Sequence, residues 1–435
     1  MHSDTIFAVS SGAPPAGIAV LRISGPRAAE ALSAMAGPLP APRRASLRDL
    51  RHPIYGQLLD RALILWFPGP RTATGEDLGE IHAHGGRAVV RAIEDALGAI
   101  AGVRRALPGE FTRRALDNGR IDLAEAEGLG DLLSAETEGQ RRAALAMSGG
   151  ALSRLVLAWQ ERLLALSAGV EAILDFSDEE DVDADAATVQ RLAAGMAALA
   201  NEWRRARELP PVERLHDGIS VAIAGPPNAG KSTLINALAQ REAAIVSPLA
   251  GTTRDIIEVP LALEGIAFRF ADTAGLHAGT GDVIEAMGME RARVWAAGAD
   301  MLLWLGLPEE APDHACRCLI AAQADRAAEQ EDWATRSSGA DITLSAVTGE
   351  GMDVLNQWLI SRARDLIPHE GDVALNRRQR DVLARAEECF AAQETDLLLI
   401  AEQLRHARNA LSSITGGAGT EAMLDALFGR FCIGK

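Results

Sequence analysis

Cysteine is scarce in this chain, which has four cysteines among its 435 residues. They are scattered along the sequence, as Cys316, Cys318, Cys389 and Cys432. A fold held together by disulfides needs more cysteines in a shorter chain. Cys316 and Cys318 have one residue between them, which is not the spacing of a zinc site. We therefore expect free thiols.

Long apolar runs and an excess of positive charge are absent as well. No run of about 18 uncharged apolar residues occurs, and the first residues lack the basic and apolar regions of a signal peptide. Acidic residues outnumber basic ones by 60 to 43, which gives a formal charge of -17. These features predict a cytoplasmic protein without a membrane segment. A contact with nucleic acid would then require a local basic patch or a partner protein.

Residues 1–118 have the pattern of an α+β domain. The apolar runs GIAVLRI, ALILWF and EIHAH predict strands separated by Gly/Pro turns, and GRAVVRAIEDALGAI is the one stretch with helical spacing. The whole chain is 48% hydrophobic and 24% charged. It is therefore globular and long enough for about two to four domains.

Two segments, residues 119–213 and 371–435, are rich in Ala, Leu and Glu with helical spacing and predict a helical domain. Between them, residues 214–370 alternate strand-like and helix-like segments, as in ISVAIAG and FRFADTAG. This order suggests an α/β domain inserted into a helical one whose halves share a core. The acidic run DFSDEEDVDADAA in the first helical segment is expected to be a solvated loop or a helix start.

The stretch GPPNAGKST, residues 225–233, fits the P-loop pattern and lies between an apolar strand and a helical stretch. Glycines allow backbone N–H groups to surround phosphates. Lys231 can reach the terminal phosphates, and the Ser232 hydroxyl can bind Mg²⁺. The motif in this context predicts a nucleoside triphosphate site.

Two later segments have the pattern of GTPase switches. The loop AGTTRD can supply a threonine to Mg²⁺, and DTAG at a strand end offers Asp272 for the ion and Gly275 for the terminal phosphate. LSAVTGEG is typical of a loop that contacts a guanine base. The fold class is therefore a multidomain α+β and α/β protein with an inserted Ras-like P-loop GTPase domain.

Base recognition is the weakest part of this pattern. Guanine-specific proteins carry Asn-Lys-x-Asp after a strand, whereas this chain has Ala322, Gln323, Ala324 and Asp325. Asp325 can still accept two hydrogen bonds from guanine. Loss of the Asn and the Lys stem would weaken binding by about 1–3 kcal/mol. We expect a preference for guanine with reduced affinity.

The motifs that follow one another along nearly the whole chain are DTIFAV, GIAVLRISGP, TGEDLGEIHAHGG, LPGEFTRRALDNGRIDLAEAEGLGDLL, GVEAILDFSDEEDV, GPPNAGKST, AGTTRD, DTAGL, IEAMGMERA and FCIGK. In this order they resemble the MnmE (TrmE) family of tRNA-modification GTPases. The resemblance implies an N-terminal folate-binding domain that mediates homodimerisation. It also implies a helical domain made of two segments and an inserted GTPase that hydrolyses GTP in a K⁺-dependent way.

The family's reaction, by the same resemblance, places an aminomethyl-type group on carbon 5 of the wobble uridine of certain tRNAs. It uses 5-formyl- or methylene-tetrahydrofolate. A FAD-containing MnmG-type partner joins the homodimer in a heterotetramer with tRNA as substrate. Two alternatives of other classes stay open, a GTP-dependent regulatory switch or assembly factor without modification activity, and a P-loop ATPase.

Site residues carry over from the family where this chain matches its motifs. Mg²⁺ would be held by Ser232 and Thr253, and Glu285 would orient the attacking water. The K⁺ ligands would be Asn228, Ser247, Leu249 and Thr252. The folate would contact Arg22, Glu80, Arg120 and Lys435. The residues expected to contact GTP are Asn228, Ala229, Gly230, Lys231, Ser232, Thr233, Ser247, Pro248, Leu249, Ala250, Gly251, Thr252, Thr253, Asp272, Thr273, Ala274, Gly275, Asp325, Ser345, Ala346 and Val347.

The C-terminal FCIGK places Cys432 four residues from the end, as in a prenylation box. Gly434 and Lys435 do not suit such a box, and no polybasic tract precedes it. The resemblance instead places the tail against the folate. Cys432 is then either a working thiol in tRNA modification or a packed small side chain, and both readings stay open.

Overall fold

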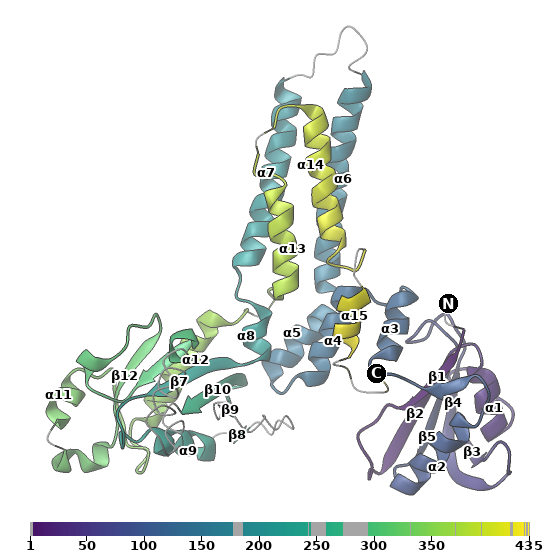
Figure 1. Ribbon diagram of the computed structural model, residues 1–435, viewed down its shortest axis with the longest axis horizontal. Coiled ribbons are helices and arrows are strands. Elements are labelled where there is room, and N and C mark those ends of the chain that lie inside the picture. The colour runs from purple at the N-terminus through teal and green to yellow at the C-terminus, as the bar shows by residue number, and fades with distance from the viewer. Residues whose placement is uncertain are drawn as a thin grey trace, which may run out of the picture. The chain divides into compact units, whose positions relative to one another are not determined.

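The computed structural model describes residues 3–176, 186–241, 243–244, 258–272, 295–330, 332–369, 371–392, 394–417, 421–429, 431 and 434. The chain divides into two compact units. Figure 1 labels helices and strands along the chain. The first unit comprises residues 1–130, 147–162 and 408–435, and the second comprises residues 131–146 and 163–407. Within the described ranges, no helix combines the length and the apolar composition needed to cross a membrane.

The first unit contains a six-stranded sheet in the order β3-β4-β5-β2-β1-β6. All neighbouring strands are antiparallel except β1 and β6, which are parallel. The predicted strands GIAVLRI, ALILWF and EIHAH are confirmed as β2, β4 and β5. The strands are β1 (Thr5–Val9), β2 (Ile18–Ser24), β3 (Ser46–Arg51), β4 (Leu58–Phe67), β5 (Leu78–His84) and β6 (Val103–Arg105).

Three helices accompany this sheet, namely α1 (Ala28–Ala36), α2 (Arg87–Gly98) and α3 (Glu110–Asp117). Buried residues of α1 and α2 share a core with Phe7 and Leu21 of the sheet. Phe111 of α3 packs instead with Ile6 and Ala8, whose side chains alternate with that of Phe7. The prediction of a single helical stretch was wrong, because it recognised only α2. The other two helices are short, and α3 buries charged Arg114, which hides its inner face in a hydrophobicity pattern.

Helical segments from far apart in the sequence meet in the first unit. The described aromatic residues Phe428 and Phe431 near the C-terminus pack with Ala126 of α4 (Leu123–Ser134). The backbone N–H of Leu123 donates to the carbonyl of Thr415 at 3.2 Å. The helix α15 (Glu421–Phe428) contacts α3 through the ion pair of Arg113 with Asp425.

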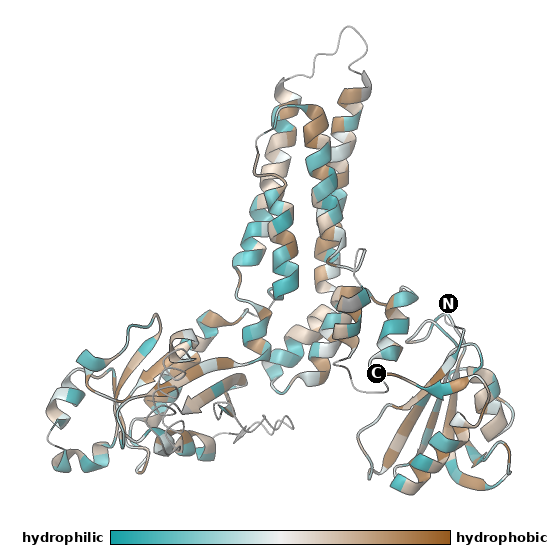
Figure 2. Cartoon of the chain, in the orientation of Figure 1, coloured by the Kyte–Doolittle hydropathy of each residue, from teal (hydrophilic) through white to brown (hydrophobic). Residues whose placement is uncertain are grey.

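The second unit pairs helices in the same way, since α7 (Ala186–Glu208) packs against α13 (Arg377–Glu388). The rings of Trp203 and Phe390 stack at 5.4 Å between centroids. Hydrophobic and polar residues alternate along these helices in Figure 2, as expected of helices that bury one face. The contacts of α4 with the C-terminal residues lie in the first unit and those of α7 with α13 lie in the second, so one helical domain from residues 119–213 and 371–435 stays a prediction. The same two sequence segments also contain α5 (Glu138–Ser148), α6 (Ala151–Phe176), α8 (Val212–His216) and α14 (Leu397–Ser412).

The α/β part of the second unit has a seven-stranded sheet in the order β13-β12-β11-β7-β10-β9-β8. The strands β13, β12, β11, β7 and β10 are parallel, and β9 and β8 run antiparallel to their neighbours. The strands are β7 (Ile219–Ala224), β8 (Ala243–Ala244), β9 (Glu258–Leu263), β10 (Ile266–Asp272), β11 (Met301–Trp304), β12 (Arg317–Ala321) and β13 (Ile342–Thr343).

Helices pack against this sheet through two buried clusters. The helices α9 (Lys231–Arg241) and α12 (Met352–Leu366) share one buried cluster with the strands, through residues such as Leu234 and Leu355. A second cluster joins Ala222 and Leu302 to Ala296 and Ala299. Short helices α11 (Trp333–Ser338), η2 (Pro308–Glu310) and η3 (Ala324–Glu329) lie in the connections. The carboxyl ends of parallel strands are the usual place for a ligand in such a sheet.

Candidate functional sites

The P-loop occupies the turn from the central strand β7 to α9. Gly225 and Gly230 have φ of +149° and +95° there. These are values that side-chain-bearing residues rarely adopt. A Cβ on Gly225 would lie 3.1 Å from the carbonyl carbon of Leu305. Asn228 adopts a left-handed φ of +62°. The loop therefore needs glycine at the two ends of its curve, as a phosphate-binding turn does.

Lys231 lies beneath this loop with 5% of its surface exposed. Its Nζ donates to the carbonyls of Gly225 and Pro226 at 2.9 and 2.8 Å. A buried ammonium requires such acceptors. Lys231 therefore places a positive charge at the N-terminus of α9, where backbone N–H groups also favour anions. Ser232 and Thr233 are exposed in the first turn of α9. This set of groups fits a triphosphate with its Mg²⁺.

The two base-recognition loops are joined by a side-chain hydroxyl and by a backbone bond, in which the N–H of Ala324 donates to the carbonyl of Leu344 at 3.1 Å. Ser345, fully buried, donates from Oγ to Asp325 Oδ1 at 2.5 Å and accepts from the N–H groups of Val347 and Thr348 at 3.3 and 3.1 Å. Its own N–H donates to the carbonyl of Glu350 at 2.9 Å. Ser345 therefore acts here through its side chain, which orients the exposed carboxylate of Asp325. Ala346 is half-buried beside it.

Gln323 connects this region to the P-loop. Its Nε2 donates to the backbone carbonyl of Asn228 at 2.9 Å. Ala322, which stands where an asparagine is usual, is buried with 3% exposure. From the sequence, Gln323 is expected only to lack the stem and the charge of the usual lysine. No sequence signal marked its contact, because residues 323 and 228 are far apart along the chain.

A second candidate site lies on the N-terminal sheet, where Arg22 of β2 pairs with Glu80 of β5. Arg22 Nε and Glu80 Oε1 are 2.9 Å apart, and the other oxygen of Glu80 lies 3.0 Å from His82 Nε2. The Arg22 and Glu80 side chains are 36% and 15% exposed. The structure thus brings together two predicted folate contacts. His82 was not predicted, because a histidine in a strand pattern carries no distinguishing signal.

Arg120 approaches this region through the loop of residues 72–76. Its Nε donates to the carbonyl of Thr72 at 3.2 Å, and Asn118 Nδ2 donates to the carbonyl of Thr74 at 2.7 Å. On the same loop, Glu76 accepts from Ser24 Oγ at 2.7 Å. Ser24 lies two residues after Arg22 and therefore on the same face of the sheet. The loop links Arg120 to the strand that carries Arg22.

The C-terminal tail contacts the same domain. The carbonyl of Gly434 accepts from Ser10 Oγ at 2.8 Å. A Cβ on Gly434, whose φ is +95°, would lie 2.1 Å from the carbonyl oxygen of Val9. In the register of β1 with β2, Val9 follows Ala8, the partner of Arg22. The tail therefore lies at the end of the strand next to Arg22.

Comparisons with known proteins identify the family to which this chain belongs. The profile described as the MnmE helical domain matches residues 123–432, and that described as the GTP-binding protein TrmE N-terminus matches residues 5–120. A tRNA modification GTPase MnmE from Sphingopyxis alaskensis is 59% identical over 95% of this chain and 100% of its own. One from Rhizorhabdus wittichii is 59% identical over 100% of this chain and 97% of its own. The chain belongs to the MnmE family.

Solved structures of other GTP-binding proteins also align with part of the chain. The G domain of the FeoB iron transporter of T. maritima covers 33% of this chain and 98% of its own at 23% identity. Its TM-score of 0.25 is too low to support an argument about this chain. The family assignment depends on the full-length MnmE relatives instead.

Several residues expected from the MnmE resemblance lie outside the described residues, so they stay predictions. They are Ser247, Pro248, Leu249, Ala250, Gly251, Thr252, Thr253, Thr273, Ala274, Gly275, Glu285, Cys432 and Lys435. For Asp272 the structure gives the backbone, at the end of β10. Of the nucleotide residues, the structure describes the P-loop and the base-recognition loops.

The described thiols are free, as expected for Cys316, Cys318 and Cys389. Burial raises the pKa of all three, and that of Cys318 rises to about 12. None of these three is therefore a thiolate near neutral pH. In the part of the chain that the structure describes, no three His, Cys, Asp or Glu side chains gather as a metal site.

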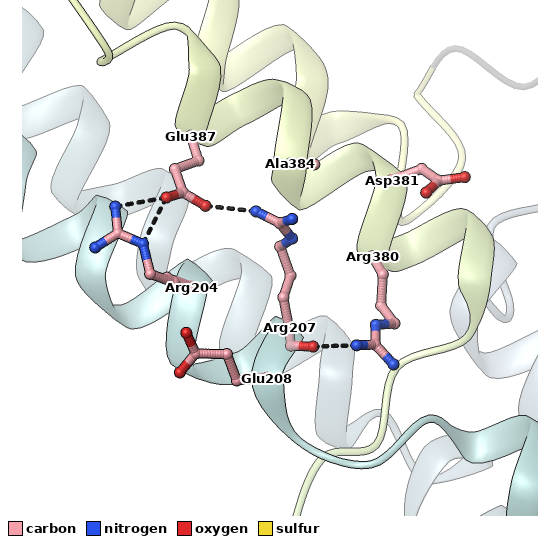
Figure 3. Close-up of a pocket in the computed structure, with 7 residues that line it drawn as sticks. All are labelled: Arg204, Arg207, Glu208, Arg380, Asp381, Ala384 and Glu387. Carbon is pink, nitrogen blue, oxygen red and sulfur yellow. Dashed lines mark hydrogen bonds and ion pairs between the residues drawn. The ribbon is translucent and has the colours of Figure 1, made fainter. Parts of the chain in front are cut away.

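A cavity of about 550 Å³ lies between α7 and α13 (Figure 3). Three arginines and three acids line it, so its formal charges balance. Glu387 pairs with Arg204 and Arg207 at 2.6 and 2.5 Å. Arg380 donates to the backbone carbonyl of Arg207. We interpret this cavity as part of the polar contact between two helices. The lining residues are Arg204, Arg207, Glu208, Arg380, Asp381, Ala384 and Glu387.

Proposed function

We propose that this chain is a GTP hydrolase that takes part in modifying carbon 5 of the wobble uridine of tRNA. The observation that carries the proposal is the P-loop, where buried Lys231 and two glycines of positive φ surround an anion-binding turn at the carboxyl end of β7. The full-length relatives named tRNA modification GTPase support the reaction.

The nucleotide would be held by the residues of the P-loop and of the base loops. Lys231 would contact the terminal phosphates, while Asp325 would accept hydrogen bonds from the N–H donors of guanine. Ser232 and Thr253 would hold Mg²⁺, and Asn228, Ser247, Leu249 and Thr252 would hold K⁺. Bound there, both cations supply positive charge where the phosphates gain negative charge during hydrolysis. Glu285 would orient the attacking water.

The N-terminal sheet would bind a one-carbon tetrahydrofolate, as 5-formyl- or methylene-tetrahydrofolate. Glu80 offers a carboxylate for the N–H donors of a pterin ring, and the guanidinium groups of Arg22 and Arg120 suit the carboxylates of a folate tail. The carboxylate of Glu80 and the guanidinium groups of Arg22 and Arg120 all lie in the first unit. When bound, the folate supplies the one-carbon unit that the modification needs.

The tail would form one wall of this folate site. The contact of Gly434 with Ser10 supports this placement, and Lys435 would add a cation to it. Cys432 would then act in tRNA modification. Replacement of Cys432 by Ser should abolish modification and leave GTP hydrolysis intact, whereas full modification by this variant would reduce the thiol to a packing role.

Partners follow from the same proposal. The chain would act as a homodimer with a FAD-containing MnmG-type protein in a heterotetramer, in the cytoplasm and with tRNA as substrate. Exposed apolar side chains support a dimer surface on the N-terminal sheet, where Leu47 pairs across the strands with Leu63, at 53% and 42% exposure. Exposed apolar groups of this kind often mark contacts between proteins.

The hydrolase proposal predicts that purified protein turns over GTP faster in KCl than in NaCl of equal concentration. Lys231→Ala should lose about 100-fold or more in turnover, because it removes a charge that stabilises the transferring phosphoryl group. Arg241→Ala is a matched control, since Arg241 is an exposed cation at the other end of α9 and pairs with Asp353. Equal rates in both salts would contradict the role of Asn228 in binding K⁺, and unchanged turnover by Lys231→Ala would contradict the site.

A further inference from the structure

The side-chain amide of Gln323 is the direct connection between the base-recognition loop and the P-loop. Gln323 follows β12 and has a left-handed φ of +66°. Besides its bond to the carbonyl of Asn228, the amide lies against Gly230, where a Cβ would be 3.3 Å from Gln323 Nε2. One side chain therefore contacts the P-loop on both sides of Ala229.

A chain of hydrogen bonds fixes the orientation of this amide. Gln330 Nε2 donates to Gln323 Oε1 at 3.1 Å, and Arg336 Nη1 donates to Gln330 Oε1 at 2.7 Å. An arginine can only donate, and the carbonyl of Asn228 can only accept. The two ends of the chain therefore determine which atom of each amide is nitrogen. Arg336 is 8% exposed, so the chain begins at a buried anchor.

The backbone of the P-loop needs such support. Asn228 has a left-handed φ of +62°, as Gln323 does. For residues other than glycine this conformation carries strain, and it persists where surrounding contacts define it. The bond from Gln323 joins the two strained residues. Without it, the segment of residues 228–230 would lose the hydrogen bond that the carbonyl of Asn228 accepts from Gln323.

We propose that Gln323 is a positioning residue of the nucleotide site, which holds residues 228–230 of the P-loop in their phosphate-binding conformation through a bond that Gln330 and Arg336 orient. The inference rests on the proposed function, since it assumes that this P-loop binds a guanine nucleotide. It assigns a role to Gln323 in place of the lysine of the usual Asn-Lys-x-Asp motif. The side-chain amide of Gln323 thereby recovers part of the nucleotide affinity that the absence of the lysine removes.

The test is the dissociation constant of a fluorescent GDP analogue, measured on the full chain. Gln323→Met keeps the length of the stem but has no donor, and it should raise this constant about three- to tenfold, the range for loss of one hydrogen bond. Gln323→Lys restores a donor and should bind within about twofold of the original protein. Gln357→Met, at an exposed glutamine of α12, is the matched control and should change nothing.

A second pair of variants separates positioning from general loss of structure. Gln330→Met should weaken binding less than Gln323→Met. In the Gln323→Met background it should add little, because the bond from Gln330 to the Gln323 side chain is already gone there and only the longer contact of Gln330 Nε2 with the backbone carbonyl of residue 323, at 3.5 Å, is left. Additive losses would contradict the proposed chain of bonds. A loss in Gln323→Met that Gln323→Lys fails to reverse would also contradict it.

The inference and the proposed function fail in different ways. If the original protein binds the GDP analogue and Gln323→Met binds it equally well, the positioning role is wrong and the nucleotide site stands. If the original protein does not bind the analogue at all, the proposed function is wrong and the inference falls with it.

Discussion

At the scale of single residues, the nucleotide site depends on where charge is held. Lys231 and Asp325 are at opposite ends of the expected nucleotide, and each is oriented by neutral groups. Two backbone carbonyls hold Lys231, and the buried hydroxyl of Ser345 holds Asp325. A charge that is oriented before the ligand arrives loses less entropy when it binds. Asp325 is therefore expected to carry base selectivity even though the asparagine of the usual motif is missing.

This role of Asp325 gives a prediction about the choice of base. Guanine offers two N–H donors to the carboxylate, while xanthine has a carbonyl in place of the amino group. Asp325→Asn should weaken GTP binding by about 100-fold, because one hydrogen bond loses its charged acceptor and the amide NH₂ then faces an N–H donor of guanine. The same NH₂ can donate to the carbonyl of xanthine, so binding of xanthosine triphosphate should improve. Competition against a fluorescent GDP analogue measures both.

A matched control for this variant is Asp353→Asn, at an aspartate of α12 whose side chain is 87% exposed. It should leave the choice of base unchanged. If Asp325→Asn kept its preference for GTP over xanthosine triphosphate, Asp325 would not read the base. The preference would then have to come from other groups.

At the scale of elements, α3 is attached to the N-terminal sheet by buried charges. Arg114 is fully buried and lies 2.9, 3.2 and 3.0 Å from carboxylate oxygens of Asp4, Glu76 and Glu110. Glu110 also pairs with Arg104 at 2.5 Å. Such a cluster is costly to break, because each remaining charge stays buried without its partner. Since Arg120 lies just after α3, the cluster also positions a predicted folate contact.

The cluster predicts how stability depends on pH. Burial opposes ionisation of Glu110, but the hydrogen bonds from Arg104, Leu107 and Arg114 outweigh it and lower the pKa below the ordinary 4.5. The pKa of Asp4 is lowered from 3.8 in the same way, against the effect of burial, by Arg104 and Arg114. Lowered pKa values give stability that is present above the ordinary values and is lost as the pH falls through the folded ones. The attachment of α3 should therefore weaken below about pH 4.5.

Glu110→Gln tests this dependence. At pH 7 this variant should have a free energy of opening of α3 that is about 3 kcal/mol lower than that of the original protein. This difference in opening free energy should become smaller toward pH 3. Hydrogen exchange read on peptides from α3, corrected for intrinsic rates, measures it. Glu138→Gln is the control, because Glu138 also begins a helix and pairs with two arginines but is exposed. A difference that is independent of pH would contradict the role of the carboxylate.

At the scale of the whole molecule, local elements could be predicted from the sequence more readily than the contacts between them. The apolar run, the P-loop motif and the helical spacing that follows it predict β7, the P-loop and α9, because each of these signals lies within a short stretch of sequence. The helical pairing of α7 with α13 was expected from the segment order and is present as the stack of Trp203 on Phe390. The bonds that define the sites were not predictable. Gln323 with Asn228, Ser10 with Gly434 and His82 with Glu80 each depend on the fold, which brings side chains together without a pattern in the sequence.

The proposed function assigns a nucleotide site to one unit and a folate site to the other. If both sites serve one reaction, GTP hydrolysis at the P-loop and tRNA modification belong to one cycle. A switch or assembly factor without modification activity would use the same P-loop but would leave tRNA unchanged. The wobble uridine distinguishes these two cases.

The most direct measurement is mass spectrometry of tRNA nucleosides from a strain that lacks this protein, complemented with the original chain or with Lys231→Ala. We expect unmodified wobble uridine in the deletion strain, restored modification with the original chain, and little or none with Lys231→Ala at equal protein level. Unchanged modification in the deletion strain would contradict the proposed function.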